Sequence, residues 1–233
     1  MSHHRRIDPL KKPTLASMVT DRLRELIVEG AYEPGEQLNE VDLASRFGTS
    51  RGPIREGLRQ LVHEGLLRSE PHRGAFVPYL SNEDIRDVYQ AREAIETAAA
   101  KQLIESETNA HVSVALEKTV QAMKRAVVAR EWTRLADLEM RFHTELVTAA
   151  GSARLSRMYA TLLDETRICL RMTTAHPGRE ELVTQHHELA RSLAAGDEKE
   201  TLAAITRHLR ESVELITAGR PEHMAPSGKW PPD

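Results

Sequence analysis

The chain has 233 residues, a formal net charge of -3 and 40% hydrophobic residues, which suffices for one or two folded domains with apolar cores. Its single cysteine excludes a disulfide framework and a zinc ribbon built on CxxC pairs. No stretch approaches the roughly 18 apolar residues of a membrane helix, and the first residues lack the apolar segment of a secretory signal. We therefore expect a soluble, cytoplasmic protein with no membrane partner. Aromatic residues make up only 4%, which favours a mainly helical chain with aliphatic cores.

In chain order, the pattern of apolar residues and turn signals first predicts a compact N-terminal domain. It contains a helix over 14–30, a turn at Pro34–Gly35, a short helix over 39–48, a third helix over 51–63, and two short strands within 66–80. The tip of the hairpin falls at His72–Gly74. Helix, helix, turn, helix and hairpin is the order of a winged helix-turn-helix.

Positive charge is concentrated in this domain. Residues 46–73 include six arginines against three glutamates, which indicates a polyanionic partner for this segment. The third helix has an apolar stripe at Ile54, Leu58 and Leu61, and about a quarter-turn away a stripe of Arg51, Arg55 and Arg59. An α-helix fits the DNA major groove, where arginine can donate two hydrogen bonds to guanine. A solvated arginine face is the alternative for such a helix taken alone.

Two further positions suit DNA binding. Ser50 precedes the third helix and can place its hydroxyl and backbone N–H on a phosphate. Arg73 and Gly74 at the hairpin tip suit a wing in the minor groove, because glycine permits close approach of the backbone.

The segment 34–67, followed by PHRGAFV, resembles the DNA-binding domain of GntR-type transcription regulators, over about residues 14–79. The resemblance implies contacts to operator DNA from Ser50, Arg51, Arg55, Arg73 and Gly74. Val41 departs from the family, which often has a base-contacting arginine there, so the operator sequence does not follow from the resemblance.

In the second half of the chain, the apolar periodicity and turn residues predict about six helices between residues 85 and 219. Breaks are expected near 106–109, 130, 151–152, 176–178 and 196–197. The expected organisation is a DNA-binding domain over 10–79, a linker over 80–84, a helical domain over 85–219 and a disordered tail over 220–233. No strand pattern competes, so the fold class is mainly α.

Polar residues occupy apolar faces of these helices. Glu139 and His143 lie one turn apart on the apolar face of the helix 132–150, and His186 is central on that of 180–195. His208 is a further candidate on the last long helix. A carboxylate and histidines that converge in a core are suitable ligands for a divalent metal, while a hydrogen-bonded core histidine is the simpler interpretation of each one alone.

Arg92 lies at the centre of the inward stripe of the helix 85–104. An inward arginine requires an anion. Glu96, one turn later, is one candidate, and the carboxylate of a bound ligand is the other.

Residues 85–210 resemble the FCD ligand-binding domain that follows the DNA-binding domain in one branch of the GntR family. The resemblance implies a divalent metal (Zn, Ni or Mn) held by Glu139, His143, His186 and His208, although the family usually has Asp in place of Glu139. It also implies a small organic acid near the metal, with Arg92 as a contact.

Together these features predict a metabolite-responsive repressor that binds an inverted-repeat operator as a homodimer. Two alternatives remain open at this point. One is a metal-dependent hydrolase, for which no nucleophile motif and no HExxH is present, so we expect no enzymatic activity. The other is a regulator whose metal is purely structural.

Overall fold

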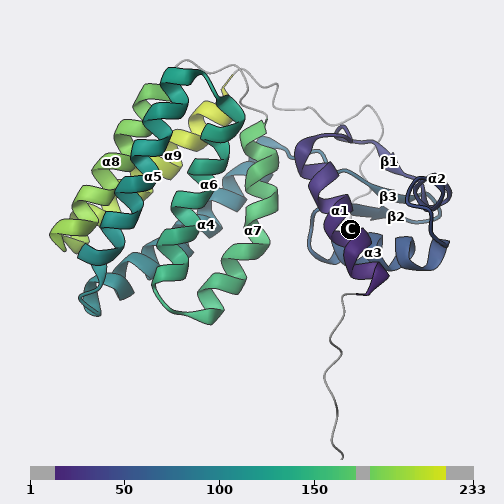
Figure 1. Cartoon of the computed structure of the whole chain (residues 1–233), viewed down its shortest axis with the longest axis horizontal. Helices are drawn as coiled ribbons and strands as arrows, with labels where there is room; N and C mark the ends of the chain where they lie inside the picture. Colours follow the sequence, from purple (N-terminus) through teal and green to yellow (C-terminus); the bar gives the residue numbers. More distant parts are fainter. Residues whose placement is uncertain (1–13, 172–178, 219–233) are drawn as a thin grey trace, which may run out of the picture. The chain divides into compact units, whose positions relative to one another are not determined.

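A computed structural model describes residues 14–171 and 179–218 (Figure 1). The chain forms two compact units that divide between Pro78 and Tyr79. The expected disordered tail and the start of the segment 10–79 lie outside the described residues. Within the described ranges, no helix is long and apolar enough to cross a lipid bilayer.

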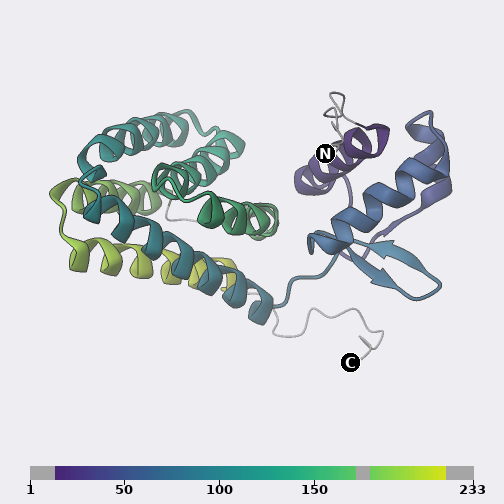
Figure 2. The same cartoon turned by 90° about the horizontal axis from the view of Figure 1, so that it is seen from below.

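The first unit has three helices and a small sheet. Its elements are α1 (Leu15–Glu29), β1 (Gln37–Leu38), α2 (Glu40–Arg46), α3 (Arg51–His63), β2 (Arg68–Glu70) and β3 (Gly74–Phe76). The strand order is β1-β3-β2 and both pairings are antiparallel. The hairpin of β2 and β3 is visible in Figure 2. The winged helix-turn-helix predicted from the sequence is confirmed, whereas β1 falls in a segment that was expected to be a turn only.

Local signals set the ends of these helices. Thr14 caps α1 by accepting a hydrogen bond from the backbone of Ser17, and Gly30 ends it with φ 77°. Asn39 caps α2. In α3 the predicted apolar stripe is buried, with Ile54 and Leu61 at 0% exposure, and the arginine stripe is exposed. The core therefore holds one side of α3 and leaves its arginines in solvent.

The second unit is a bundle of α4 (Asn82–Glu105), α5 (Asn109–Ala129), α6 (Trp132–Ala149), α7 (Ala153–Arg171), α8 (Arg179–Ala195) and α9 (Glu198–Thr217). Four of the predicted breaks are confirmed, and the one at 176–178 lies outside the described residues. The helix α4 begins at Asn82, inside the segment 80–84 that was expected to be a linker. A capping box explains this start, because Ser81 and Asp84 exchange side-chain and backbone hydrogen bonds.

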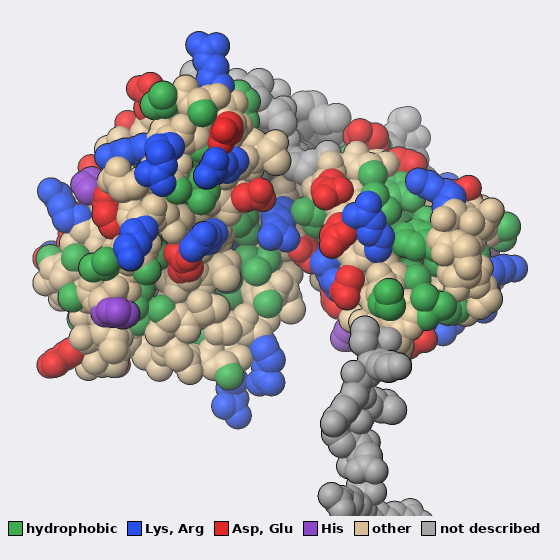
Figure 3. Space-filling view, in the orientation of Figure 1, with side chains coloured by type: hydrophobic (Ala, Val, Ile, Leu, Met, Phe, Trp, Pro, Cys, Tyr) green, Lys and Arg blue, Asp and Glu red, His purple; other side chains and the backbone are tan. Residues whose placement is uncertain are grey.

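The helices pack so that α4 contacts α6, α7 and α9, while α5 contacts α6 and α8 (Figures 1 and 2). On the face of this unit drawn in Figure 3, basic and acidic side chains are interspersed. The core between α4, α6, α8 and α9 contains, besides aliphatic residues, fully buried polar groups. These groups form the site described next.

Candidate nucleic-acid interface and metal centre

The N-terminal end of α3 presents exposed hydrogen-bond donors. Ser50 is the N-cap of α3, and its side chain makes no capping hydrogen bond. Arg51 and Arg55 follow on the exposed side and share one acceptor, the carboxylate of Glu40 on α2. Val41, next to Glu40, is 59% exposed. This end of the unit combines two guanidinium groups with the hydroxyl of Ser50, which does not cap the helix.

The hairpin tip has a similar character. The side chain of Arg73 is 68% exposed and pairs with Glu70. Gly74 has φ 98°, a backbone conformation that strains any residue with a Cβ. The guanidinium carbon of Arg73 lies 5.2 Å from the centre of the Phe76 ring. The structure thus places an exposed arginine on a tight turn at the tip of the wing.

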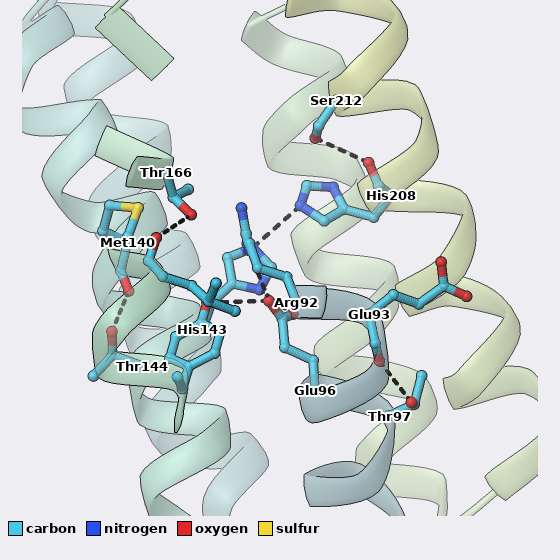
Figure 4. Close-up of polar contacts among 12 residues, drawn as sticks. Arg92, Glu93, Glu96, Thr97, Met140, His143, Thr144, Thr166, His208 and Ser212 are labelled. Carbon is cyan, nitrogen blue, oxygen red and sulfur yellow. Dashed lines mark hydrogen bonds and ion pairs between the residues drawn. The ribbon is translucent and has the colours of Figure 1, made fainter. Parts of the chain in front are cut away.

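Three histidines meet in the core of the second unit. His143 on α6, His186 on α8 and His208 on α9 are at most 1% exposed. The Nε2 atom of His143 lies 3.2 Å from Nε2 of His208 and 3.2 Å from Nε2 of His186. Ligand atoms of all three lie within 4.8 Å of one another. Figure 4 shows His143 and His208 reaching toward each other from their helices.

The opposite nitrogen of each ring faces an acceptor. Nδ1 of His143 lies 2.7 Å from Oε2 of Glu96, and Nδ1 of His186 lies 2.7 Å from the carbonyl oxygen of Leu182. Nδ1 of His208 lies 2.9 Å from Oε1 of Gln185. Because carboxylate, carbonyl and amide oxygens only accept, each Nδ1 carries a proton, and in the neutral form of each ring Nε2 carries a lone pair.

Three lone pairs that point at one another repel unless a cation lies among them. A proton on one Nε2 can form a hydrogen bond with only some of the other lone pairs, whereas a divalent ion can accept all three. Two nitrogens bound to one tetrahedral zinc ion are about 3.3 Å apart, given Zn–N distances of roughly 2.0–2.1 Å. The observed separations of 3.2 Å agree with this value, so the three side chains fit a divalent metal.

The structure does not bring Glu139 into this cluster. Glu139 is buried at 4% exposure on α6, but the group of candidate ligands contains the three histidines alone. Burial raises the pKa of Glu139, partly opposed by the nearby charges of His143 and Arg92. Glutamate at this position therefore differs from the metal ligand that the resemblance implied.

Next to the histidines lies a buried ion pair. Nε of Arg92 is 3.0 Å from Oε1 of Glu96 (Figure 4), and the Tyr159 hydroxyl donates to the same oxygen at 3.0 Å. Burial by itself would raise the pKa of Glu96, but His143 and Arg92 lower it to about 2. Glu96 is therefore an ionised acceptor that connects Arg92 to His143. The sequence left two partners open for Arg92, namely Glu96 and the carboxylate of a ligand. In the structure, Glu96 accepts a hydrogen bond from Nε of Arg92 only.

Three buried donors at this place have no acceptor in the part of the chain that the structure describes. Nη1 and Nη2 of Arg92 and the hydroxyl of Tyr89 are buried and make no hydrogen bond with any described residue. The two side chains are close, with the guanidinium carbon of Arg92 4.7 Å from the centre of the Tyr89 ring. An unsatisfied buried donor costs about 1–3 kcal/mol, and more when it is charged. The site is therefore complementary to a small anion.

The pKa values of the histidines suit metal binding. Burial, with a contribution from the neighbouring His143, lowers the pKa of His186 to about 3. Burial likewise lowers the pKa of His208, with contributions from His186 and His143. Both rings are therefore neutral near pH 7, which is the form that binds a metal.

Sequence reasoning did not find Tyr89, Tyr159 or Gln185. Gln185 directly precedes His186 on α8 and also donates to Glu211 on α9, which fixes its amide oxygen toward His208. Tyr89 precedes Arg92 by one helical turn, so its place on the inward stripe was a usable signal. Tyr159 lies on α7, and nothing in the sequence pairs it with Glu96.

Comparison with known proteins agrees with this architecture. Residues 15–77 match the gntR family of bacterial regulatory proteins, and residues 87–211 match the FCD domain. The chain is 29% identical over 207 residues to the HTH-type transcriptional repressor RspR of Escherichia coli K12, covering 86% of this chain and 88% of RspR. It is also 29% identical over 168 residues to the HTH-type transcriptional regulator YdhC of Bacillus subtilis, covering 72% of this chain and 75% of YdhC.

Solved structures share the fold. A GntR transcriptional regulator from Rhodococcus sp. RHA1 has a TM-score of 0.74 at 23% identity, covering 88% of this chain and 99% of that one. McbR/YncC of E. coli has a TM-score of 0.73 at 20% identity, covering 88% and 98%. The chain therefore belongs to the GntR family of DNA-binding transcription regulators, and its helical unit is an FCD domain.

Proposed function

We propose that the protein is a repressor whose affinity for an operator is controlled by a small carboxylate bound beside a divalent metal in the FCD domain. One observation supports a carboxylate effector above all others. Nη1 and Nη2 of Arg92 are buried beside the histidine cluster and have no acceptor among the described residues. A repressor role is supported by the repressor RspR among the relatives.

On the DNA side, we assign the direct contacts to the exposed donors of the first unit. Arg51 and Arg55 would contact base edges in the major groove, and Ser50 would bind a phosphate at the start of α3. Arg73 and Gly74 would place the wing in the minor groove. A homodimer would bring two such surfaces to the two halves of an inverted repeat.

On the effector side, a carboxylate fits the guanidinium of Arg92 because Nη1 and Nη2 can donate to its two oxygens in parallel. The hydroxyl of Tyr89 would supply a further donor to the ligand. Glu96 already neutralises part of the charge of Arg92 through Nε, so one carboxylate gives each of the two remaining nitrogens an acceptor.

The three histidines would hold the metal through Nε2, and Glu96, Leu182 and Gln185 would keep their rings in the required tautomer. A bound divalent ion supplies a Lewis-acidic positive charge that attracts an anionic ligand. Arg92 would orient that ligand from α4, and the buried setting would exclude water. Glu139, whose pKa burial raises, would lie beside the site and would not bind the metal.

The effector would act through α4. Arg92 belongs to this helix, and α4 begins only four residues after Pro78, the last residue of the DNA-binding unit. A ligand held by Arg92 would therefore favour one position of the helix that leads to the DNA-binding unit. Regulation requires that the effector binds one arrangement of the dimer more tightly than the other.

The test combines ligand binding with DNA binding. Full-length protein of measured metal content is screened by thermal shift against small carboxylic acids, with and without added Zn²⁺, Ni²⁺ or Mn²⁺. An operator is obtained by selection from random DNA. We expect at least one acid to raise the melting temperature in a metal-dependent way and to weaken operator binding, and we expect Arg92→Gln to abolish both effects.

If the protein selects a DNA motif but responds to no acid, the proposed repressor role stands and the proposed carboxylate effector is wrong. In that case a chelator should unfold the FCD domain, as expected for a purely structural metal. A protein that selects no motif would overturn the assignment of the DNA-contacting residues.

A further inference from the structure

One carboxylate holds both of the arginines assigned to base contacts. Glu40 is the first residue of α2, and its Oε2 lies 3.3 Å from Nη2 of Arg51 and 3.0 Å from Nη2 of Arg55. Nε of Arg55 lies 3.2 Å from Oε1 and from Oε2. Glu40 therefore links the helix before the turn to the first two turns of α3.

The contact leaves part of each guanidinium available. Glu40 occupies the Nε–Nη2 edge of Arg55, and the Nη1–Nη2 edge is the one that can donate two hydrogen bonds to O6 and N7 of guanine. The side chains of Arg51 and Arg55 remain 59% and 49% exposed, and that of Glu40 is 30% exposed. All three groups can therefore approach a ligand while they stay paired.

A carboxylate at this place is unfavourable for simple attraction to DNA. It cancels positive charge on a surface that approaches phosphates, and affinity for DNA of any sequence depends mainly on the number of phosphates neutralised. Glu40 instead restricts the side-chain conformations of Arg51 and Arg55. Free arginine side chains lose up to about 2 kcal/mol of rotamer entropy when they are fixed, and a guanidinium held in one plane has already lost part of it.

We propose that Glu40 is a positioning residue for sequence-specific DNA recognition, which fixes the guanidinium groups of Arg51 and Arg55 and weakens binding of the same surface to unrelated DNA. This inference rests on the proposed role of the two arginines in operator binding. It assigns Glu40 no contact of its own with a base.

The experiment compares full-length wild type with Glu40→Gln and Glu40→Asp on the operator selected by wild type and on scrambled DNA, over a series of salt concentrations. Glu56→Gln is the matched control, because it removes an exposed negative charge on α3 without breaking an ion pair among the described residues. Circular dichroism and thermal melting establish that each variant is folded.

For Glu40→Gln we expect the ratio of operator affinity to scrambled-DNA affinity to fall about tenfold, the order of a lost charged hydrogen bond. We also expect a steeper salt dependence, by roughly 0.9 in slope for each additional phosphate contact. Glu40→Asp keeps the charge but its shorter side chain cannot span both arginines, so the ratio should fall with no gain in binding to scrambled DNA. Glu56→Gln should keep the ratio.

An unchanged ratio in both Glu40 variants would overturn the inference. So would a loss confined to Glu40→Gln, because that result would assign the effect to charge and not to positioning. If wild type selects no operator, the proposed function fails and the inference fails with it; if wild type selects one and the variants remain equally selective, only the inference fails.

Discussion

The carboxylate of Glu96 lies 2.7 Å from Nδ1 of His143, 47 residues away in sequence, and both side chains are fully buried. The same carboxylate accepts from Arg92 and from Tyr159. Glu96 thus connects the candidate metal ligands with the candidate anion-binding arginine. A carboxylate behind a metal-binding histidine fixes the ring and raises its basicity.

The first prediction concerns this contact. Glu96→Gln should weaken binding of a divalent metal by about 10- to 100-fold, because the neutral amide no longer polarises the His143 ring. Competition of the full-length protein against a chelator of known affinity measures the change. Glu105→Gln, an exposed change at the end of the same helix, should bind metal like wild type. Equal affinities of wild type and Glu96→Gln would show that the Glu96 carboxylate does not strengthen metal binding by His143.

The second prediction uses a matched pair of tyrosines. The Tyr89 hydroxyl is buried and has no acceptor among the described residues, whereas that of Tyr159 donates to Glu96. Removing an unsatisfied buried hydroxyl is neutral or stabilising, while removing a satisfied one costs about 0.5–1.5 kcal/mol. In ligand-free protein, Tyr89→Phe should therefore keep or raise the free energy of unfolding, and Tyr159→Phe should lower it.

The two variants should also differ in ligand binding. Tyr89→Phe should weaken binding of the acid found in the thermal-shift screen by about tenfold, which corresponds to one hydrogen bond to a charged group. Isothermal titration measures the affinity. A Tyr89→Phe protein that is less stable without ligand and binds the acid normally would contradict the assignment of this hydroxyl to the effector.

Much of this site could be predicted from helical periodicity, and what could not be predicted depends on packing between helices. The 3.6-residue repeat places His143 and His186 on inward faces, whereas His208 is offset from the main apolar stripe of its helix, and the structure brings all three together. Glu139 shares the face of His143, and a spacing of four residues is compatible with two ligands of one ion, but the structure places only the three histidines in the candidate cluster of the described residues. A shared helix face therefore does not by itself identify a ligand.

The remaining features are contacts between distant segments. Nothing in the local pattern of α4 states that Glu96 meets His143, because this depends on how α4 and α6 pack. The two-residue strand β1 likewise exists through its pairing with β3. The ends of the helices, by contrast, were predictable, since caps such as Asn39 and Ser81 are local signals.

The third prediction is a dependence of stability on pH in the absence of metal. The pKa of His186 is about 3 in the folded protein against an ordinary value of 6.5, so the unfolded chain binds more protons between these values. The free energy of unfolding should therefore be highest above pH 6.5 and should fall as the pH decreases toward 3. Glu96, with a pKa of about 2 against 4.5, acts in the same direction at lower pH.

Urea denaturation of chelator-treated protein between pH 7.5 and 4.5 measures this slope. His186→Gln removes one of two buried histidines with a lowered pKa and should reduce the slope between pH 6.5 and 4.5, while His208 maintains the remainder. His111→Gln, an exposed change on α5, should keep the wild-type slope. An equal slope in all three proteins would place the acid sensitivity elsewhere in the chain.

The last prediction separates charge from geometry on α3. Arg55→Lys keeps the positive charge but replaces a planar group with a single ammonium, which cannot donate in parallel to O6 and N7 of guanine. Binding to scrambled DNA should remain within about twofold of wild type, because that binding depends on charge. Binding to the selected operator should weaken by roughly 1–3 kcal/mol, the value of one bidentate base contact.

Fluorescence anisotropy at a fixed salt concentration measures both affinities. Arg22→Lys on α1, where the arginine pairs with Glu25 at the surface, is the control and should leave both unchanged. If Arg55→Lys lowers both affinities equally, Arg55 contacts phosphate and not a base, and the sequence preference of this regulator arises from other residues.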